Sequence, residues 1–214
     1  MVTLRRLFRH RSSGPYTLYA YVNEFGEFDY EAYRQTQTEA NHRKINLVWA
    51  REDDIAWLAS IVFHRGEPKF GLCHGTRQGV EQAWFSKRLG CRVVGTEISD
   101  TAAQFPSTVE WDFHKVNPEW VGKADFVYSN ALDHAYDPDL ALNTWMGQLR
   151  PHGVCIIEHS KWHSPSHTSQ VDPFGADLAI MPYLVLQWSR GKFAVREIHH
   201  RGDRQFLFIE HNRR

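Results

Sequence analysis

Cysteine is scarce in this sequence of 214 residues, and the few cysteines form no metal-binding or redox pattern. Cys73, Cys91 and Cys155 each lie in or beside an apolar stretch, and none belongs to a Cys-x-x-Cys pair. Exported proteins that rely on disulfides use cysteine more densely, whereas reduced thiols in a core are typical of cytoplasmic proteins. We therefore expect reduced core thiols and a cytoplasmic location.

An excess of charge of either sign is also lacking. The 25 Lys and Arg residues balance 25 Asp and Glu residues, so no net field attracts nucleic acid or an anionic membrane, and a nucleic-acid partner is disfavoured. The first residues carry Arg5, Arg6, Arg9 and Arg11, which could bind an anionic partner, but solvated chain ends are commoner.

Long apolar runs are absent from residues 1–13, so the sequence predicts neither a signal peptide nor a membrane span there. We expect a soluble protein without a membrane partner, and the sequence leaves a homodimer open. Internal repeats and low-complexity segments are lacking too. The chain is long enough for one α/β domain with an appendage.

The pattern of apolar residues changes near residue 67. Apolar and aromatic residues between 28 and 65 recur at steps of three and four, which predicts two or three amphipathic helices. We therefore divide the chain into an N-terminal helical extension or cap, residues 1–66, and a ligand-binding domain, residues 67–214.

Beyond that point, short apolar runs alternate with helical stretches. We expect strands at residues 70–73, 92–96, 109–113, 124–129 and 154–158, with helices at 80–89 and 140–149. Strands separated by helices pair in parallel. Residues 192–200 and 204–211 are joined by a turn too short for a crossover, so they form an antiparallel hairpin. The predicted fold is a Rossmann-like, doubly wound α/β sheet that ends in this hairpin.

Ligands of open parallel sheets bind at the carboxyl ends of the strands. After the first strand, the segment from Cys73 to Gly79 turns tightly, and Gly75 and Gly79 allow the backbone to approach a ligand. Glu97 ends the second strand, where a carboxylate can accept hydrogen bonds from both hydroxyls of a ribose. Alone, the loop could be a plain turn and Glu97 a helix-capping acid, but together they favour an adenosine-bearing ligand.

Two later segments narrow the prediction. Asp112 and Phe113 end the predicted third strand. An Asp there can accept a hydrogen bond from the adenine amino group while an aromatic ring packs on the base. Residues 128–138 read Tyr-Ser-Asn-Ala-Leu-Asp-His-Ala-Tyr-Asp-Pro, and residues 149–153 read Leu-Arg-Pro-His-Gly. A nicotinamide cofactor fits less well, because the spacing G-x-G-x-x-G is missing.

Because of these residues, the stretch from 70 to 160 resembles the class I S-adenosylmethionine-dependent methyltransferases, in particular the group that acts on small molecules. The resemblance implies that S-adenosylmethionine is the cofactor. It also implies a set of contact residues: Cys73, His74, Gly75, Thr76, Arg77, Gly79, Glu97, Ile98, Asp112, Phe113, Asn130, Ala131 and Leu132.

The sequence departs from the family in its first strand, which usually carries an acid before the loop glycines. Phe70, Gly71 and Leu72 offer none, and His74 and Arg77 stand where the family favours small residues. This departure leaves open how the methionyl group is held. Arg77 either pairs with its carboxylate or has a surface role.

Methyl transfer requires that an acceptor be positioned and, for a hydroxyl, that its proton be removed. His134 and His159 follow the fourth and fifth strands and are the candidate bases; the alternative is that each is structural. No Asn/Asp-Pro-Pro-Tyr/Phe tetrapeptide follows the fourth strand, which argues against amino-methylation of bases. The candidate acceptor-binding residues are Tyr33, Gln37, Asn41, Asp133, Trp162 and His163.

A metal is not expected. His159, His163 and His167 are spaced by four, but Pro165 interrupts a helix across them and no thiol joins them. The sequence thus predicts an S-adenosylmethionine-dependent methyltransferase acting on a small polar acceptor, with O-methylation of a sugar or a biosynthetic intermediate favoured. The alternatives are an inactive S-adenosylmethionine-binding module and a nucleic-acid methyltransferase.

Overall fold

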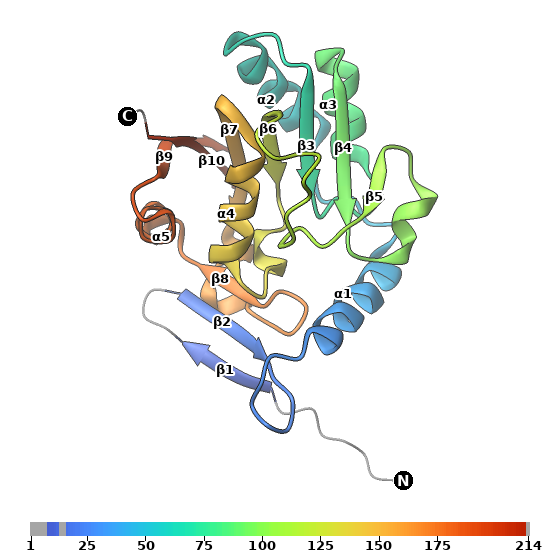
Figure 1. The fold of residues 1–214 in the computed structure, drawn as a ribbon, viewed down its shortest axis with the longest axis vertical. Coiled ribbons are helices and arrows are strands. Elements are labelled where there is room, and N and C mark those ends of the chain that lie inside the picture. Colours follow the sequence, from blue (N-terminus) through green and yellow to red (C-terminus); the bar gives the residue numbers. More distant parts are fainter. Residues whose placement is uncertain (1–7, 13–15, 213–214) are drawn as a thin grey trace.

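Seven strands form the main sheet of the computed structural model, which describes residues 8–12 and 16–212. Their order is β5-β4-β3-β6-β7-β10-β9 (Figure 1). Strands β3 to β7 pair in parallel, and β10 is antiparallel to both β7 and β9. The bounds are β3 (Phe70–His74), β4 (Arg92–Glu97), β5 (Thr108–Glu110), β6 (Ala124–Ser129), β7 (Leu149–Ser160), β9 (Phe193–Arg201) and β10 (Arg204–His211).

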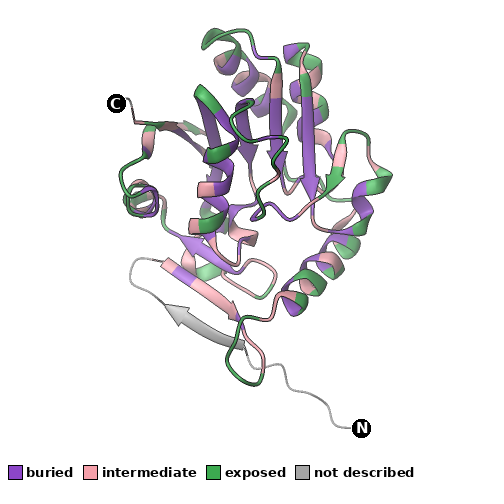
Figure 2. Ribbon diagram, viewed as in Figure 1, coloured by how far each residue is buried: buried purple, intermediate pink, exposed green. Residues whose placement is uncertain are grey.

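Helices cover both faces of this sheet, and two of them form crossovers between parallel strands. On one face, α2 (Glu52–His64) and α3 (Val80–Leu89) bury an apolar cluster that includes Leu58 and Phe85. On the other, α4 (Pro138–Gln148) and α5 (Met181–Ser189) bury a larger cluster around Trp145. The central strands are buried on both sides (Figure 2), which explains their continuous apolar runs.

Two helices, α1 and α4, begin at capping residues near the carboxyl edge of the sheet. α1 (Tyr30–Lys44) begins after Asp29, whose carboxylate accepts from the amide of Ala32 at 2.9 Å. α4 begins after Asp137, which accepts from Leu140 N at 2.9 Å, and Pro138 occupies its first turn. These caps orient both helices with their N-termini near the predicted site.

The predicted α/β sheet with its final antiparallel hairpin is confirmed. The strand at 124–129 and the helix at 80–89 have the predicted bounds. The third strand is shorter than predicted: β5 ends at Glu110, because Asp112 folds into a turn in which its carbonyl accepts from Lys115 N at 2.9 Å. α5 was not predicted, although Pro182 in its first turn is a residue that favours the start of a helix.

A second, three-stranded sheet lies beside the carboxyl edge of the first (Figure 1). It consists of β1 (Phe8–Ser12), β2 (Tyr16–Tyr21) and β8 (Phe174–Ala176), all antiparallel. The predicted N-terminal extension therefore contains strands as well as α1 and α2, and its division at residue 66 stays a prediction. Arg5 and Arg6 lie outside the described residues, as do the side chains of Arg9 and Arg11.

Across the residues that the structure describes, every helix is too short or too polar to cross a lipid bilayer.

Candidate functional site

The loop after β3 approaches its neighbours closely enough to require glycine. Gly75 has a φ of +74°, and a Cβ added there would lie 2.4 Å from the Cβ of Ala131. The amides of Gly75 and Thr76 donate to Thr96 O at 2.9 and 3.0 Å, which ties the loop to β4. The loop thus lies between the ends of β4 and β6, where the strand connections diverge and leave a crevice.

Glu97 ends β4 and faces this loop. The side chain is 7 % exposed. One carboxylate oxygen accepts from Arg77 N and the other from Ser99 N, both at 3.1 Å. Burial raises the pKa of Glu97, and these two backbone hydrogen bonds oppose the increase. Because each carboxylate oxygen has a second lone pair, Glu97 can still accept from a pair of vicinal hydroxyls.

Asp112 follows β5 and is the second carboxylate at this edge. Its Oδ1 accepts from His114 N at 3.0 Å and contacts His114 Nδ1 at 2.8 Å, and its Oδ2 accepts from the hydroxyl of Tyr30 at 3.0 Å. Burial acts to raise the pKa of Asp112, but the hydrogen bonds and the charge of His114 outweigh it and lower the pKa. Asp112 is therefore held as a carboxylate, an acceptor for N–H donors.

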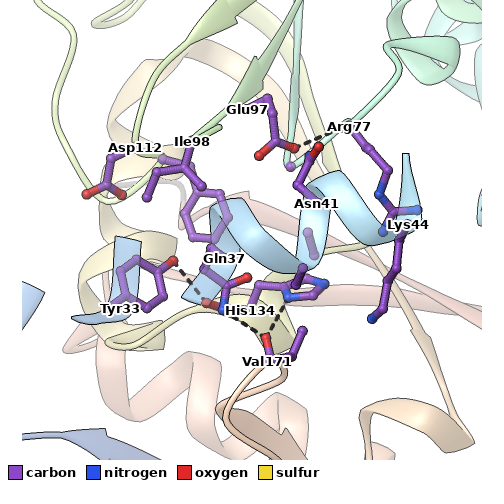
Figure 3. A pocket seen from close by; sticks show the side chains of 14 residues that line it. Tyr33, Gln37, Asn41, Lys44, Arg77, Glu97, Ile98, Asp112, His134 and Val171 are labelled. Carbon is purple, nitrogen blue, oxygen red and sulfur yellow. Dashed lines mark hydrogen bonds between the residues drawn. The ribbon is translucent and has the colours of Figure 1, made fainter. Parts of the chain in front are cut away.

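Two adjoining cavities lie at this edge of the sheet. The smaller, of about 50 Å³, lies between these strand ends and α1 (Figure 3). The larger measures about 650 Å³, within the size range of small-molecule sites. Both are lined by Lys44, Gly75, Arg77, Ala131 and His134. A ligand at the glycine loop would contact both.

The smaller cavity brings together predicted cofactor residues and residues predicted for the acceptor. Its wall includes Gly75, Arg77, Glu97, Ile98, Asp112, Phe113 and Ala131, and also Tyr33, Gln37 and Asn41 of α1. Hydrogen bonds hold the three side chains of α1 in place. Tyr33 donates to His134 O at 3.1 Å, Gln37 donates to Val171 O at 2.9 Å, and Asn41 accepts from Thr101 Oγ1 at 2.9 Å. α1 therefore covers the predicted cofactor edge.

The larger cavity contains the other residues predicted for the acceptor. Asp133, Trp162 and His163 line it, together with Thr76, Asn130 and His134. One side is apolar: Leu47, Val48 and Trp49 lie there with exposures of 62, 48 and 39 %. Other lining residues are polar and come from the segment around His134 and from Asp172. The cavity thus suits a molecule with an apolar face and a polar group.

His134 lines both cavities, and its tautomer follows from its contacts. Nδ1 lies 2.9 Å from Val171 O, a carbonyl that can only accept, so Nδ1 carries the proton in the neutral ring. Nε2 then has the free lone pair. Asp172 Oδ1 lies 3.6 Å from Nδ1. A neutral His134 is thus arranged to accept a proton at Nε2.

His159, the other candidate base, is placed differently. It is 6 % exposed, lines neither cavity, and donates from Nε2 to Ala176 O at 2.9 Å. Burial lowers its pKa. His163 accepts from Ser160 N at its Nδ1, at 2.9 Å, so its neutral ring carries the proton on Nε2, which faces Asn130 O at 3.3 Å. Of these histidines, His134 alone combines cavity access with a free acceptor nitrogen.

Some of the predicted cofactor residues line neither cavity: Cys73, His74, Gly79 and Leu132. His74 is 1 % exposed and contacts Thr96 Oγ1 at 2.9 Å and Gln148 Oε1 at 2.8 Å. Burial lowers its pKa to about 4, so the ring is neutral. The structure therefore places the side chain of His74 in the core, stacked on Trp145, because strand alternation turns it away from the loop.

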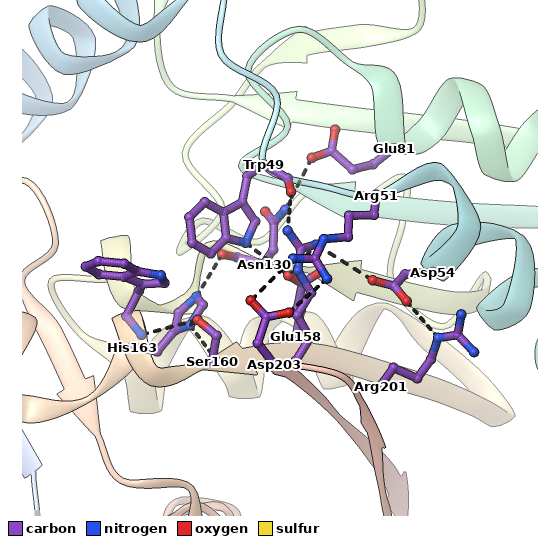
Figure 4. Close-up of polar contacts among 12 residues, drawn as sticks. Trp49, Arg51, Asp54, Glu81, Asn130, Glu158, Ser160, His163, Arg201 and Asp203 are labelled. Carbon is purple, nitrogen blue, oxygen red and sulfur yellow. Dashed lines mark hydrogen bonds and ion pairs between the residues drawn. The ribbon is translucent and has the colours of Figure 1, made fainter.

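A buried ionic network holds the apolar wall of the larger cavity (Figure 4). Trp49 donates its indole N–H to Glu158 Oε1 at 2.9 Å, and its carbonyl accepts from Arg204 at 2.5 Å. Arg204 also pairs with Glu158 at 2.9 Å, and Tyr128 donates to the second oxygen of Glu158 at 2.6 Å. Glu158 and Arg204 are 1 and 5 % exposed. Trp49 is thus attached to β7 and β10.

A cluster of possible metal ligands also faces the larger cavity. Single ligand atoms of Asp133, His134 and Asp172 lie within 4.8 Å of one another. The nitrogen of His134 that faces Asp172 is Nδ1, 3.6 Å from Oδ1 of Asp172, and in the neutral ring this nitrogen carries the proton that it donates to Val171 O. This cluster differs from the histidines at 159, 163 and 167, from which no metal site was expected.

Sequence reasoning missed Glu81, Trp49 and Asp172 of the larger cavity. A signal existed for Glu81: it lies four residues before Phe85, on the face of α3 that packs on the sheet. Trp49 and Asp172 lie in loops, where no periodicity predicts the direction of a side chain.

Comparison with known proteins supports the fold alone. The sequence matches no known protein family and no curated protein. Among solved structures, the chain is similar to a 1,6-didemethyltoxoflavin N1-methyltransferase of Burkholderia thailandensis, solved with that compound and S-adenosylhomocysteine. The TM-score is 0.63, at 14 % identity over 94 % of this chain and 97 % of the other.

Two further solved structures of methyltransferases are similar to this chain. The N-methyltransferase NodS of Bradyrhizobium japonicum, solved with S-adenosylhomocysteine, gives a TM-score of 0.60 at 11 % identity, over 83 % of this chain and all of the other. The mitomycin 7-O-methyltransferase MmcR gives 0.55 at 11 % identity, over 75 % of this chain and 54 % of that one. The chain therefore has the fold of class I S-adenosylmethionine-dependent methyltransferases, as the resemblance implied.

Proposed function

We propose that this chain binds S-adenosylmethionine and transfers its methyl group to a small polar acceptor. The observation that carries the proposal is the placement of Glu97 and Asp112. Glu97 ends β4, Asp112 follows the parallel neighbour β5, and both line one cavity with Gly75. Two carboxylate acceptors beside a glycine loop match the ribose hydroxyls and the amino group of an adenosine.

The residues fit the cofactor in their chemistry, but the space at Asp112 is narrow. The cavity there measures about 50 Å³, far below the volume of a small-molecule site. Hydrogen bonds from Tyr30 to Asp112 and from Thr101 to Asn41 tie α1 to this edge of the sheet. We therefore expect α1 to move outward when the adenine enters, and we assign Tyr33, Gln37 and Asn41 to the cofactor cover, not to the acceptor.

The acceptor belongs in the larger cavity. When bound, S-adenosylmethionine supplies a methyl group activated by its sulfonium. His134 Nε2 would accept the proton of an acceptor hydroxyl as the new O–CH₃ bond forms and the S–CH₃ bond breaks. This assignment favours an oxygen acceptor, such as a hydroxyl of a sugar or of a biosynthetic intermediate. The similar proteins include O- and N-methyltransferases of small molecules.

Binding and turnover test the proposal in sequence. Calorimetry with S-adenosylhomocysteine should give micromolar binding and a rise in melting temperature at saturation. Absence of both would refute the cofactor. A panel of sugars, phenols, amines and short nucleic acids, with release of S-adenosylhomocysteine as the readout, then tests transfer. Binding without any turnover would favour an inactive binding module. Turnover only with nucleic acid would show that the acceptor is a nucleic acid and not a small molecule.

A further inference from the structure

One buried carboxyl group in the larger cavity has no role in the function proposed above. Glu81 lies in the first turn of α3, is 4 % exposed, and lines the cavity together with Asn130 (Figure 4). Its Oε1 accepts from Asn130 Nδ2 at a long 3.4 Å. Within the part of the chain that the structure describes, its Oε2 is buried and has no hydrogen-bond partner.

A buried carboxyl group with an open oxygen is costly unless a donor reaches it. Burial raises the pKa of Glu81 to about 7, and neighbouring Glu158 acts in the same direction. The guanidinium of Arg77 lines the same cavity but donates to Leu47 O at 2.8 Å. The site is therefore complementary to a positively charged donor that residues 8–12 and 16–212 do not supply.

We propose that Glu81 binds a primary ammonium group in the larger cavity. β3, the strand that leads into the glycine loop, contains no acid that could take this role. Two other carboxylates line the cavity. Asp133 Oδ1 is also buried without a hydrogen-bond partner among the described residues, but it faces the protonated Nε2 of His163, so a donor of the protein already lies beside it. Asp133 lies 3.9 Å from His163 Nε2, and Asp172 accepts from Ser169 Oγ at 3.2 Å.

The ammonium group has two sources: the methionyl end of the cofactor, in which case the inference rests on the proposed function, or an amine on the acceptor. Paired ligands separate them. S-adenosylhomocysteine carries the amino-acid group and 5′-methylthioadenosine lacks it. Tyramine, a primary alkylamine whose aromatic ring suits the apolar wall, differs from 4-ethylphenol in its ammonium group. Each is titrated by calorimetry, the last two with and without S-adenosylhomocysteine.

The variants are Glu81→Gln, which keeps an oxygen for Asn130 but removes the charge, and Glu81→Asp, which retains the charge. Glu52→Gln is the matched control, because Glu52 lies on α2 in the same layer and is about half exposed. Loss of a charged hydrogen bond predicts binding about tenfold weaker or more for Glu81→Gln. The effect should be confined to ligands with an ammonium group, with partial rescue in Glu81→Asp.

The outcomes differ clearly. Weaker binding of S-adenosylhomocysteine, with 5′-methylthioadenosine unchanged, assigns Glu81 to the cofactor. Loss of the preference for tyramine over 4-ethylphenol assigns it to the acceptor. If Glu81→Gln remains folded and changes neither comparison, the inference is wrong. If the parent protein binds neither adenosyl compound, the proposed function fails, while the tyramine comparison still tests Glu81.

Discussion

Removal of Glu97 tests whether the end of β4 binds a ribose. Both carboxylate oxygens are committed to loop amides, Arg77 N and Ser99 N at 3.1 Å each, and both retain a lone pair for a hydroxyl. Glu97→Ala removes both acceptors. A hydrogen bond to a charged group contributes about 1.5–3 kcal/mol. We therefore expect S-adenosylhomocysteine to bind about a hundredfold more weakly, which corresponds to about 3 kcal/mol.

The same change unpairs two loop amides, so the free energy of unfolding should also fall by about 1–3 kcal/mol. Calorimetry measures the affinity, and circular dichroism shows whether the variant is folded. Glu110→Ala is the matched control, because Glu110 pairs with Glu97 across β4 and β5 but is exposed. Its affinity should equal that of the parent.

Ligands without ribose hydroxyls make the test specific. The parent should prefer adenosine to 2′,3′-dideoxyadenosine, and Glu97→Ala should lose most of that preference, because the variant has no carboxylate to accept from the hydroxyls. A folded Glu97→Ala protein that binds S-adenosylhomocysteine as tightly as the parent would refute the assignment. So would an unchanged preference for adenosine.

Three further predictions concern the base, the buried acid and the network. For a hydroxyl acceptor, His134→Ala should lower kcat by roughly a hundredfold with little change in cofactor affinity; full activity would leave positioning as the main catalytic effect. The pKa of Glu81 rises on folding from 4.5 to about 7, so the folded state binds the proton more tightly and the free energy of unfolding falls as pH rises across that interval. Glu81→Gln should remove up to about 3 kcal/mol of this pH dependence, and identical denaturant curves for parent and variant from about pH 5 to about pH 8 would contradict it. Arg204→Met should cost about 3–5 kcal/mol in thermal or chemical unfolding, because Glu158 stays buried without its cation, and adding Glu158→Gln should recover part of the loss; an unchanged melting temperature in the single variant would show that the pair contributes little.

The order of strands and helices could be predicted because each element has its own local signal. The helix at 80–89 lies between Gly79 and Gly90, both with positive φ, and the strand at 124–129 is a continuous run of buried residues. The right-handed crossover rule then leaves few arrangements of such elements. The carboxyl ends of β4 and β6 consequently meet the glycine loop at one edge, as the sequence analysis expected.

Side-chain direction was less predictable. Strand β5 ends before Asp112, yet Asp112 still faces the site because the turn that follows is held by His114. His74 and His159 looked like site residues from their positions after strands, but both are bonded inside the core. A position near a strand end predicts the neighbourhood of a side chain, whereas its direction depends on which neighbour satisfies its polar atoms.

The sequence by itself determined the class of fold, the glycine loop and the acids at the strand ends, because these depend on local periodicity and on the conformations of single residues. Only the tertiary structure decided what surrounds them. Trp49 bonds to Glu158 across 109 residues, and Gln37 bonds to the carbonyl of Val171 across 134. Contacts between segments so far apart in the chain leave no periodic pattern, since they form only when the sheet brings both segments to its carboxyl edge.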